Sequence, residues 1–145
     1  MNVQSILALK GTAVATVTQA ASLADAAQLL RDHGVGALVV SGDAKAIEGI
    51  ISERDLVRSI ATHGAGALGR SVGSTMSIDV VTCSANDGAD RLMALMTDRR
   101  IRHLPVVDDA GRLAGIISIG DVVKSRLTEL ESENQALFDY LHQGQ

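Results

Sequence analysis

The chain has 145 residues, 46% of them apolar, with 13 basic and 17 acidic side chains and a net charge of −4, a composition that excludes a disordered protein. Charges of both signs are interspersed and the aromatic residues are Phe138 and Tyr140, so neither a basic field for nucleic acid nor a platform for stacked bases is expected. Lys10 interrupts the early apolar residues and no run reaches the roughly 18 that span a bilayer, so we expect no export signal and no membrane partner. A single cysteine fits a cytoplasmic protein.

The first predicted unit covers residues 15–62 and follows an N-terminal segment of residues 1–14. Ser22 can cap its first helix and Gly34 can end that helix. The elements expected in chain order are a strand at 15–18, a helix between Ser22 and Gly34, strands at 37–40 and 47–52 joined by a tight turn, and a helix beginning near Arg54.

A glycine-rich linker at 63–78 leads into a second unit at 79–127. Cys83, the single cysteine, cannot form an internal disulfide and lies in an apolar run, where cysteine usually packs as a buried hydrophobe. The elements expected are a strand at 80–83, a helix that Asn86 or Asp87 can cap and that ends near Arg99, strands at 104–107 and 113–118 joined by a turn, and a helix beginning near Gly120.

The two units are copies of one pattern. Gly-Ile-Ile-Ser at 49–52 returns 66 residues later at 115–118. The same ungapped offset pairs further identical residues: Thr16 with Thr82, Leu38 with Leu104, Val40 with Val106, Asp43 with Asp109, Ala44 with Ala110, Asp55 with Asp121 and Val57 with Val123. The chain is therefore a tandem repeat of a β-α-β-β-α unit, an α+β fold. One such sheet would leave a face uncovered, so we expect the two copies to pack together as a pseudo-two-fold pair.

A helical tail is predicted at 128–145, continuing the last helix of the second unit. Its apolar stripe is irregular and consists of Leu127, Leu130, Leu137 and Leu141. The tail is a candidate for stabilising a dimer or binding another protein, and the alternative is that it folds back on its own repeat.

A strand that ends in Gly-hydrophobic-hydrophobic-Ser, with Asp three residues after the Ser, occurs at Gly49–Asp55 and again at Gly115–Asp121. This tandem pattern resembles the CBS domain, which is found in pairs called Bateman modules. Arg102-His103-Leu104-Pro105-Val106 and the turn at 108–111 resemble further stretches of that family. The resemblance implies a stand-alone CBS pair that acts in signal transduction and binds AMP, ADP, ATP, NAD(H) or S-adenosylmethionine in two clefts between its repeats.

By this resemblance Ser52 with Asp55, and Ser118 with Asp121, would hold the two riboses, since a carboxylate can accept hydrogen bonds from a pair of sugar hydroxyls. The alternative is that each Ser only caps a helix and each Asp only complements the helix dipole. The recurrence of both residues in two copies favours binding.

Phosphate contacts are expected from Arg102 and His103, which the family resemblance suggests, and from Arg54 at a helix start. The first repeat has Gly36 and Ala37 at the matching positions, so the two clefts should be inequivalent. Alternatively, the cations at 99, 100 and 102 only complement a helix dipole and His103 is an exposed strand residue. The resemblance suggests that adenine is held by backbone groups and apolar contacts of Thr16, Thr18, Val35, Thr82, Ser84 and Ile101.

No catalytic constellation, nucleotide-binding glycine loop or metal-ligand spacing among the histidines is visible, so we expect no enzyme activity and no metal site. The leading hypothesis is a regulatory homodimer that senses an adenine nucleotide and signals to an effector protein of unknown identity. The alternatives are a structural dimerisation module whose clefts stay empty and a small enzyme acting on a nucleotide.

Overall fold

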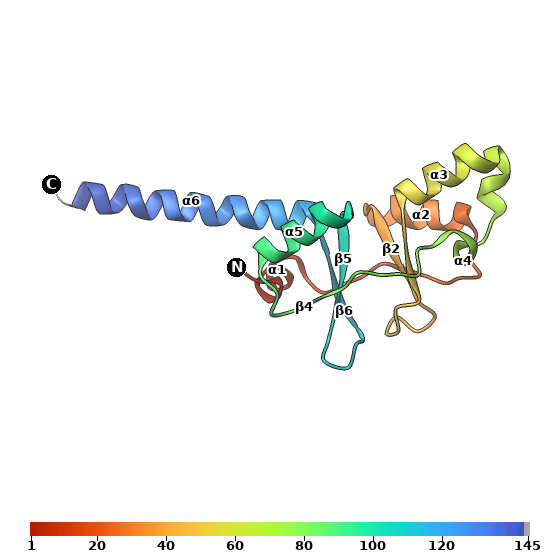
Figure 1. Cartoon of the computed structure of the whole chain (residues 1–145), viewed down its shortest axis with the longest axis horizontal. Coiled ribbons are helices and arrows are strands. Elements are labelled where there is room, and N and C mark those ends of the chain that lie inside the picture. Colours follow the sequence, from red (N-terminus) through yellow and green to blue (C-terminus); the bar gives the residue numbers. More distant parts are fainter. Residues whose placement is uncertain (144–145) are drawn as a thin grey trace.

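A computed structural model, which describes residues 1–143, arranges the chain as two units side by side with one long helix leaving the second unit (Figure 1). The elements of the first unit are β1 (Thr16–Val17), α2 (Leu23–His33), β2 (Ala37–Val40), β3 (Gly49–Ser52) and α3 (Glu53–His63). The connecting segment holds a 3-10 helix η1 (Gly64–Gly69) and α4 (Val72–Thr75). The elements of the second unit are β4 (Cys83–Ser84), α5 (Ala89–Arg99), β5 (His103–Val107), β6 (Leu113–Ser118) and α6 (Ile119–Gln143), and α1 (Val3–Lys10) precedes both units.

Each unit contains a three-stranded sheet of the same topology. In the first, β1 pairs with β2 in parallel and β2 pairs with β3 antiparallel; β4, β5 and β6 repeat this order. The register is also repeated, because Leu38 lies opposite Ile51 as Leu104 lies opposite Ile117, and all four side chains are fully buried. The predicted α+β fold of two β-α-β-β-α units is confirmed.

Local sequence signals account for most helix ends. Ser22 accepts a hydrogen bond from the backbone N–H of Asp25, and Gly34 ends α2 in the left-handed conformation at φ 64°, as predicted. The prediction that Asn86 or Asp87 caps α5 was wrong, because Gly88 is the N-cap. The carboxylate of Asp87 instead accepts a hydrogen bond from the backbone N–H of Ser84, which closes the turn before the helix.

The parallel edge strands are shorter or lie later than predicted. The strand expected at 15–18 is reduced to Thr16–Val17, and the one expected at 80–83 begins only at Cys83. Cys83 is buried, as predicted, and burial raises the pKa of its thiol to about 12. In the part of the chain described, no helix is both long and apolar enough to cross a membrane.

The helix that precedes each unit in the sequence packs on the other unit. Helix α1 comes before the first unit but buries Val3, Ile6 and Leu7 in the core of the second. Helix α4 comes before the second unit but buries Val72 in the core of the first. The sequence did not predict these two contacts. In each of them the helix that precedes one unit packs in the core of the other unit.

Glycines permit both of these helices to approach the sheets. A Cβ on Gly49 would lie 2.6 Å from the sulfur of Met76 and 2.8 Å from the backbone oxygen of Ser77, just after α4. A Cβ on Gly115, at the matching position, would lie 2.9 Å from a methyl group of Leu7 in α1. The repeated glycine of the Gly-Ile-Ile-Ser pattern therefore has a packing role in both units.

Candidate functional site

A cleft of about 500 Å³ lies between the two units, where the start of α3 faces the end of α5 and the start of β5. Its lining includes the sequence-predicted residues Ser52, Arg54, Asp55, Ile101, Arg102 and His103. We call it the first cleft. It joins the predicted ribose pair of the first repeat to the predicted phosphate contacts of the second, although these residues are about 50 positions apart in the sequence.

Ser52 and Asp55 form a capping box at the start of α3. One carboxylate oxygen of Asp55, Oδ2, accepts hydrogen bonds from the backbone N–H of Ser52 at 2.8 Å and from its hydroxyl at 3.1 Å. The backbone N–H of Asp55 donates to the Ser52 hydroxyl at 3.4 Å. Within residues 1–143 the second carboxylate oxygen, Oδ1, accepts no hydrogen bond, so it retains its capacity to accept from a ligand hydroxyl.

Ser22 and Asp25 provide an internal comparison for this pair. They form a capping box of the same spacing at the start of α2, with the Asp25 carboxylate 3.2 Å from the backbone N–H of Ser22. Neither residue lines the first cleft. The box alone is therefore a helix cap, and what distinguishes Ser52 and Asp55 is that they line a cleft.

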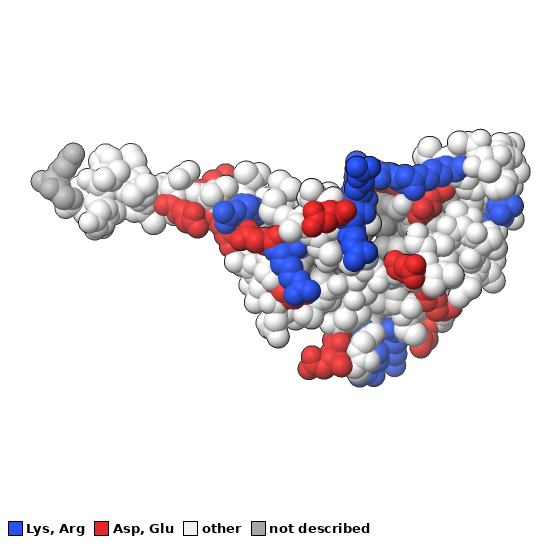
Figure 2. All heavy atoms as spheres, in the orientation of Figure 1, with Lys and Arg blue, Asp and Glu red and all other residues white. Residues whose placement is uncertain are grey.

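Five arginines line the first cleft although the chain carries a net negative charge. Arg54 and Arg58 come from successive turns of α3, while Arg99, Arg100 and Arg102 come from the end of α5 and the turn after it. Within residues 1–143 none of the five takes part in an ion pair. Figure 2 shows Lys and Arg side chains gathered over this junction, which is suited to an anion with several charges.

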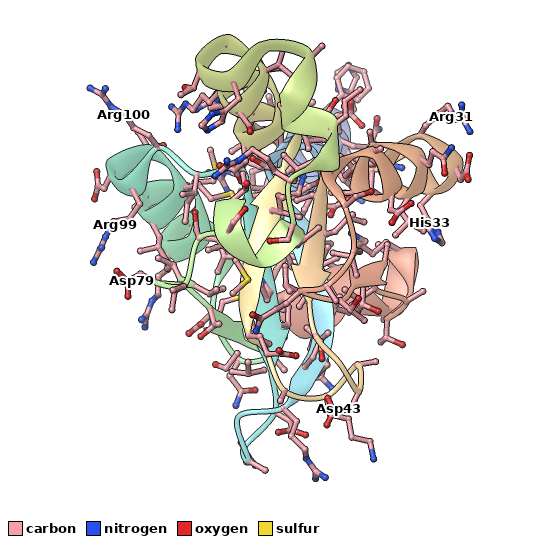
Figure 3. The ribbon with its side chains drawn as sticks, turned by 90° about the vertical axis from the view of Figure 1, so that its right-hand side faces the viewer. Arg31, His33, Asp43, Asp79, Arg99 and Arg100 are labelled. Atoms are coloured by element: carbon pink, nitrogen blue, oxygen red, sulfur yellow. The ribbon has the colours of Figure 1, made fainter. Side chains whose placement is uncertain are left out.

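Arg100 occupies a backbone conformation that usually belongs to glycine. It ends α5 in the left-handed region at φ 54°, where the first repeat has Gly34 at φ 64°. Figure 3 shows Arg99 and Arg100 projecting from the end of α5 on one side of the molecule, with Arg31 and His33 projecting from the end of α2 on the opposite side. A side chain here costs backbone energy that a glycine would avoid, and it adds a cation to the rim of the first cleft.

The wall shared by the two repeats is built around His103. A Cβ on Gly36 would lie 2.7 Å from a carboxylate oxygen of Glu53 and 3.1 Å from the His103 ring, so glycine lets these two side chains approach the start of β2. Burial is the main cause that lowers the pKa of His103, and the nearby carboxylate of Glu53 opposes this effect. His103 is therefore a half-buried part of the cleft wall, contrary to the alternative of an exposed strand residue.

Ser118 and Asp121 form the matching capping box at the start of α6, but their surroundings differ. The Lys10 ammonium group of α1 lies 2.6 Å from the Asp121 carboxylate and 2.9 Å from the backbone oxygen of Ile116. Burial alone would raise the pKa of Asp121, but hydrogen bonds from Lys10 and Ser118 outweigh it and hold the pKa below its usual value. Asp121, predicted to hold the second ribose, is thus already paired with a cation of the same chain, whereas Asp55 is not, so the surroundings of the two aspartates differ.

The residues predicted to surround adenine do not gather in the first cleft, with the exception of Ile101. Thr16 lies in β1, Thr18 and Thr82 are exposed beside the edge strands, Ser84 ends β4, and Val35 lies in a shallow hollow beside α2 and α3. The large apolar side chains that line the first cleft are Ile50 and Ile101, and Ile50 pairs with Ser77 in an isolated β-bridge.

Sequence reasoning missed Arg58 and treated Arg99 and Arg100 only as cations at a helix end. The spacing of Arg54 and Arg58 was a usable signal, because residues four apart lie on the same face of a helix. The placement of Arg99 and Arg100 opposite α3 depends on the packing of the two units and left no local signal.

The model of the CBS domain family matches residues 9–62 and 70–127 of the chain. The CBS domain-containing protein CBSX3, mitochondrial, of Arabidopsis thaliana is 41% identical over 124 residues, which are 83% of this chain and 60% of that protein. The chain thus spans less than two thirds of the length of this relative.

Solved structures of similar chains have the same fold. The CBS-domain containing protein ATU1752 from Agrobacterium tumefaciens superimposes with a TM-score of 0.83 at 47% identity, covering 87% of this chain and 99% of that one. The CBS domain pair of protein MJ0100, solved in complex with 5′-methylthioadenosine and S-adenosyl-L-methionine, gives a TM-score of 0.76 at 26% identity over 90% of this chain and 98% of that one. With two matched domains and a shared fold, the chain belongs to the CBS-domain family and carries a CBS domain pair.

Proposed function

We propose that this CBS domain pair is a regulatory module that binds an adenosine nucleotide in the first cleft and transmits its occupancy to a partner protein. The observation that carries the proposal is the meeting of the Ser52–Asp55 pair, in one cleft of about 500 Å³, with five arginines that form no ion pair within residues 1–143. A cleft of this size is within the range that holds small ligands. We expect binding without turnover.

The ribose would lie against the start of α3. The free Oδ1 of Asp55 can accept hydrogen bonds from the two ribose hydroxyls, while its Oδ2 stays bound to Ser52. The first turn of α3 also presents the positive end of the helix dipole, which favours a phosphate nearby. The adenine would contact Ile50 and Ile101, the large apolar side chains in the lining of the cleft.

The arginines support a ligand with phosphate groups. Guanidinium groups bind phosphate oxygens in paired hydrogen bonds, and the five side chains come from both walls of the first cleft. The relative MJ0100 was solved with 5′-methylthioadenosine and S-adenosyl-L-methionine, which supports an adenosine ligand. These two compounds have no phosphate group. Because of the five arginines, we expect this chain to bind ADP, ATP or NAD(H) more tightly than either of them.

A thermal-shift panel tests the proposal. At about 100 times its dissociation constant a ligand adds roughly 2.7 kcal/mol to the free energy of unfolding, which corresponds to a Tm increase of roughly 5–10 °C for a chain of this size. We expect ATP, ADP or NAD(H) to give the largest increase, AMP a smaller one, and 5′-methylthioadenosine the smallest. Inorganic triphosphate is the control for charge alone. No increase with any adenosine compound would favour a structural module with empty clefts.

Replacing Arg100 by glycine is expected to change stability and binding in opposite directions. Glycine removes the left-handed strain at φ 54° and should raise the free energy of unfolding by about 1 kcal/mol. The loss of one exposed guanidinium should weaken nucleotide binding roughly three- to tenfold. Urea denaturation and calorimetric titration measure the two effects. Arg31→Ala, at the end of α2 and outside the first cleft, is the control and should leave binding unchanged. Unchanged binding in Arg100→Gly would remove Arg100 from the site.

A further inference from the structure

Helix α6 extends beyond both units. Figure 1 shows it as a single straight helix, and its residues from 130 to 143 are exposed. Only its first turns pack on the body, where Val122 and Ser125 are buried. The helix therefore does not fold back on its own repeat, and its outer half has no covering surface among the described residues.

The exposed apolar residues of this helix follow a heptad repeat. The stripe is Val123, Leu127, Leu130, Asn134, Leu137 and Leu141, at alternating spacings of four and three residues. Its five apolar members are between 39% and 61% exposed. With Asn134 included the stripe is continuous, so the prediction of an irregular stripe was wrong. Alternating spacings of four and three are the a and d positions of a coiled coil. From these positions we infer that α6 forms a parallel, in-register two-stranded coiled coil with α6 of a second copy of this chain.

Asn134 is the residue that identifies the partner and its direction. It takes an a position between the d-position residues Leu130 and Leu137. In a parallel in-register dimer it lies opposite Asn134 of the second copy, where the two amides can hydrogen-bond to each other. In an antiparallel pair, or with an unrelated apolar groove, the amide would face an apolar side chain and lose its hydrogen bonds.

The charges beside the stripe agree with this arrangement. Arg126 takes a g position and Glu131 the e position five residues later. In a parallel dimer each Arg126 lies beside Glu131 of the second copy, which gives two attractive contacts related by symmetry. Within one chain Arg126 contacts Glu129 at 3.1 Å, so Glu131 remains available.

The stripe is turned away from the side of α6 that packs on the body. At about 100° per residue, the stripe lies roughly 130° around the helix from the buried Val122 and Ser125. The stripe from Val123 to Leu141 is about 27 Å long at 1.5 Å per residue. None of the stripe residues lines the first cleft. The inference therefore does not depend on nucleotide binding.

Disulfide crosslinking of the full chain tests the partner, the direction and the register together. Leu141→Cys introduces a thiol at an a position near the end of the stripe, and Asp139→Cys introduces one at the outward f position of the same helix. Both side chains are exposed, and the native Cys83 is buried in each variant. We expect the 141 variant to form an intermolecular disulfide at least about tenfold faster than the 139 variant at micromolar protein, since a parallel pair holds the two thiols at a high effective concentration.

A charged residue in the stripe should remove the difference in crosslinking rate between the 141 and 139 variants. Adding Leu130→Glu to the Leu141→Cys variant is expected to slow crosslinking to the rate of the Asp139→Cys variant, whereas Ser132→Glu, at an outward position, should not slow it. Circular dichroism checks that each variant remains folded. Equal crosslinking rates at 141 and 139 would overturn the inference, because an antiparallel pair or a dimer through another face would keep the two 141 positions apart. Crosslinking that survives Leu130→Glu would overturn it as well.

Discussion

Replacing Asp55 by alanine is expected to weaken nucleotide binding in the first cleft by about 100-fold, or roughly 2.8 kcal/mol. The carboxylate is placed to accept from both ribose hydroxyls, and a hydrogen bond to a charged group contributes about 1.5–3 kcal/mol. Calorimetric titration of the variant with the nucleotide that binds wild type measures the loss.

Asp25→Ala is the matched control for this substitution. It removes the same capping interaction from a helix of the same length, but at a site outside the first cleft. Both variants should lose a similar helix cap, on the order of 1 kcal/mol in the free energy of unfolding. Only Asp55→Ala should lose nucleotide affinity. Equal affinity in the two variants would show that the Ser52–Asp55 pair is a helix cap and nothing more.

Replacing Ile6 by alanine is expected to lower the free energy of unfolding by about 3 kcal/mol. Ile6 belongs to α1, which lies at the N-terminus, yet its side chain is 4% exposed in the core of the second unit. Leu9→Ala is the control on the same helix, because Leu9 is 81% exposed and its removal should change the free energy by less than about 0.5 kcal/mol.

Urea denaturation, followed by circular dichroism, measures both variants. Since α1 completes the core of the unit that comes later in the sequence, we expect Ile6→Ala to retain one transition at a lower urea concentration. Similar stabilities for Ile6→Ala and Leu9→Ala would contradict the packing of α1 on the second unit.

Features that depend on local signals were predictable. The offset between Gly49 and Gly115 predicted two equal sheets, and Ser22 and Gly34 predicted the ends of α2, because hydrophobic spacing and caps act over a few residues. Asp87 misled the prediction at α5 because an aspartate can cap a helix or close a turn, and here it closes a turn.

Features that depend on the packing of the two units were not predictable from one sequence. Lys10 and Asp121 are 111 residues apart in the chain, and their ion pair exists only because α1 crosses to the second unit. The gathering of Arg58 with Arg99 and Arg100 has the same origin, since Arg58 lies in α3 of the first unit and the other two lie at the end of α5 in the second. The predicted ribose and phosphate residues of the first cleft lie together, but their roles as ligand contacts stay predictions.

The measurement that tests the central claim most directly is calorimetric titration of the wild-type chain with ATP at about 50 mM and about 200 mM salt. We expect saturable binding with one dominant site per chain, because Asp55 is free to accept hydrogen bonds whereas Asp121 is paired with Lys10. The affinity should fall at the higher salt concentration, since exposed arginines contribute to it and salt screens them. Absence of saturable heat with ATP, ADP, NAD and AMP at both salt concentrations would contradict the account.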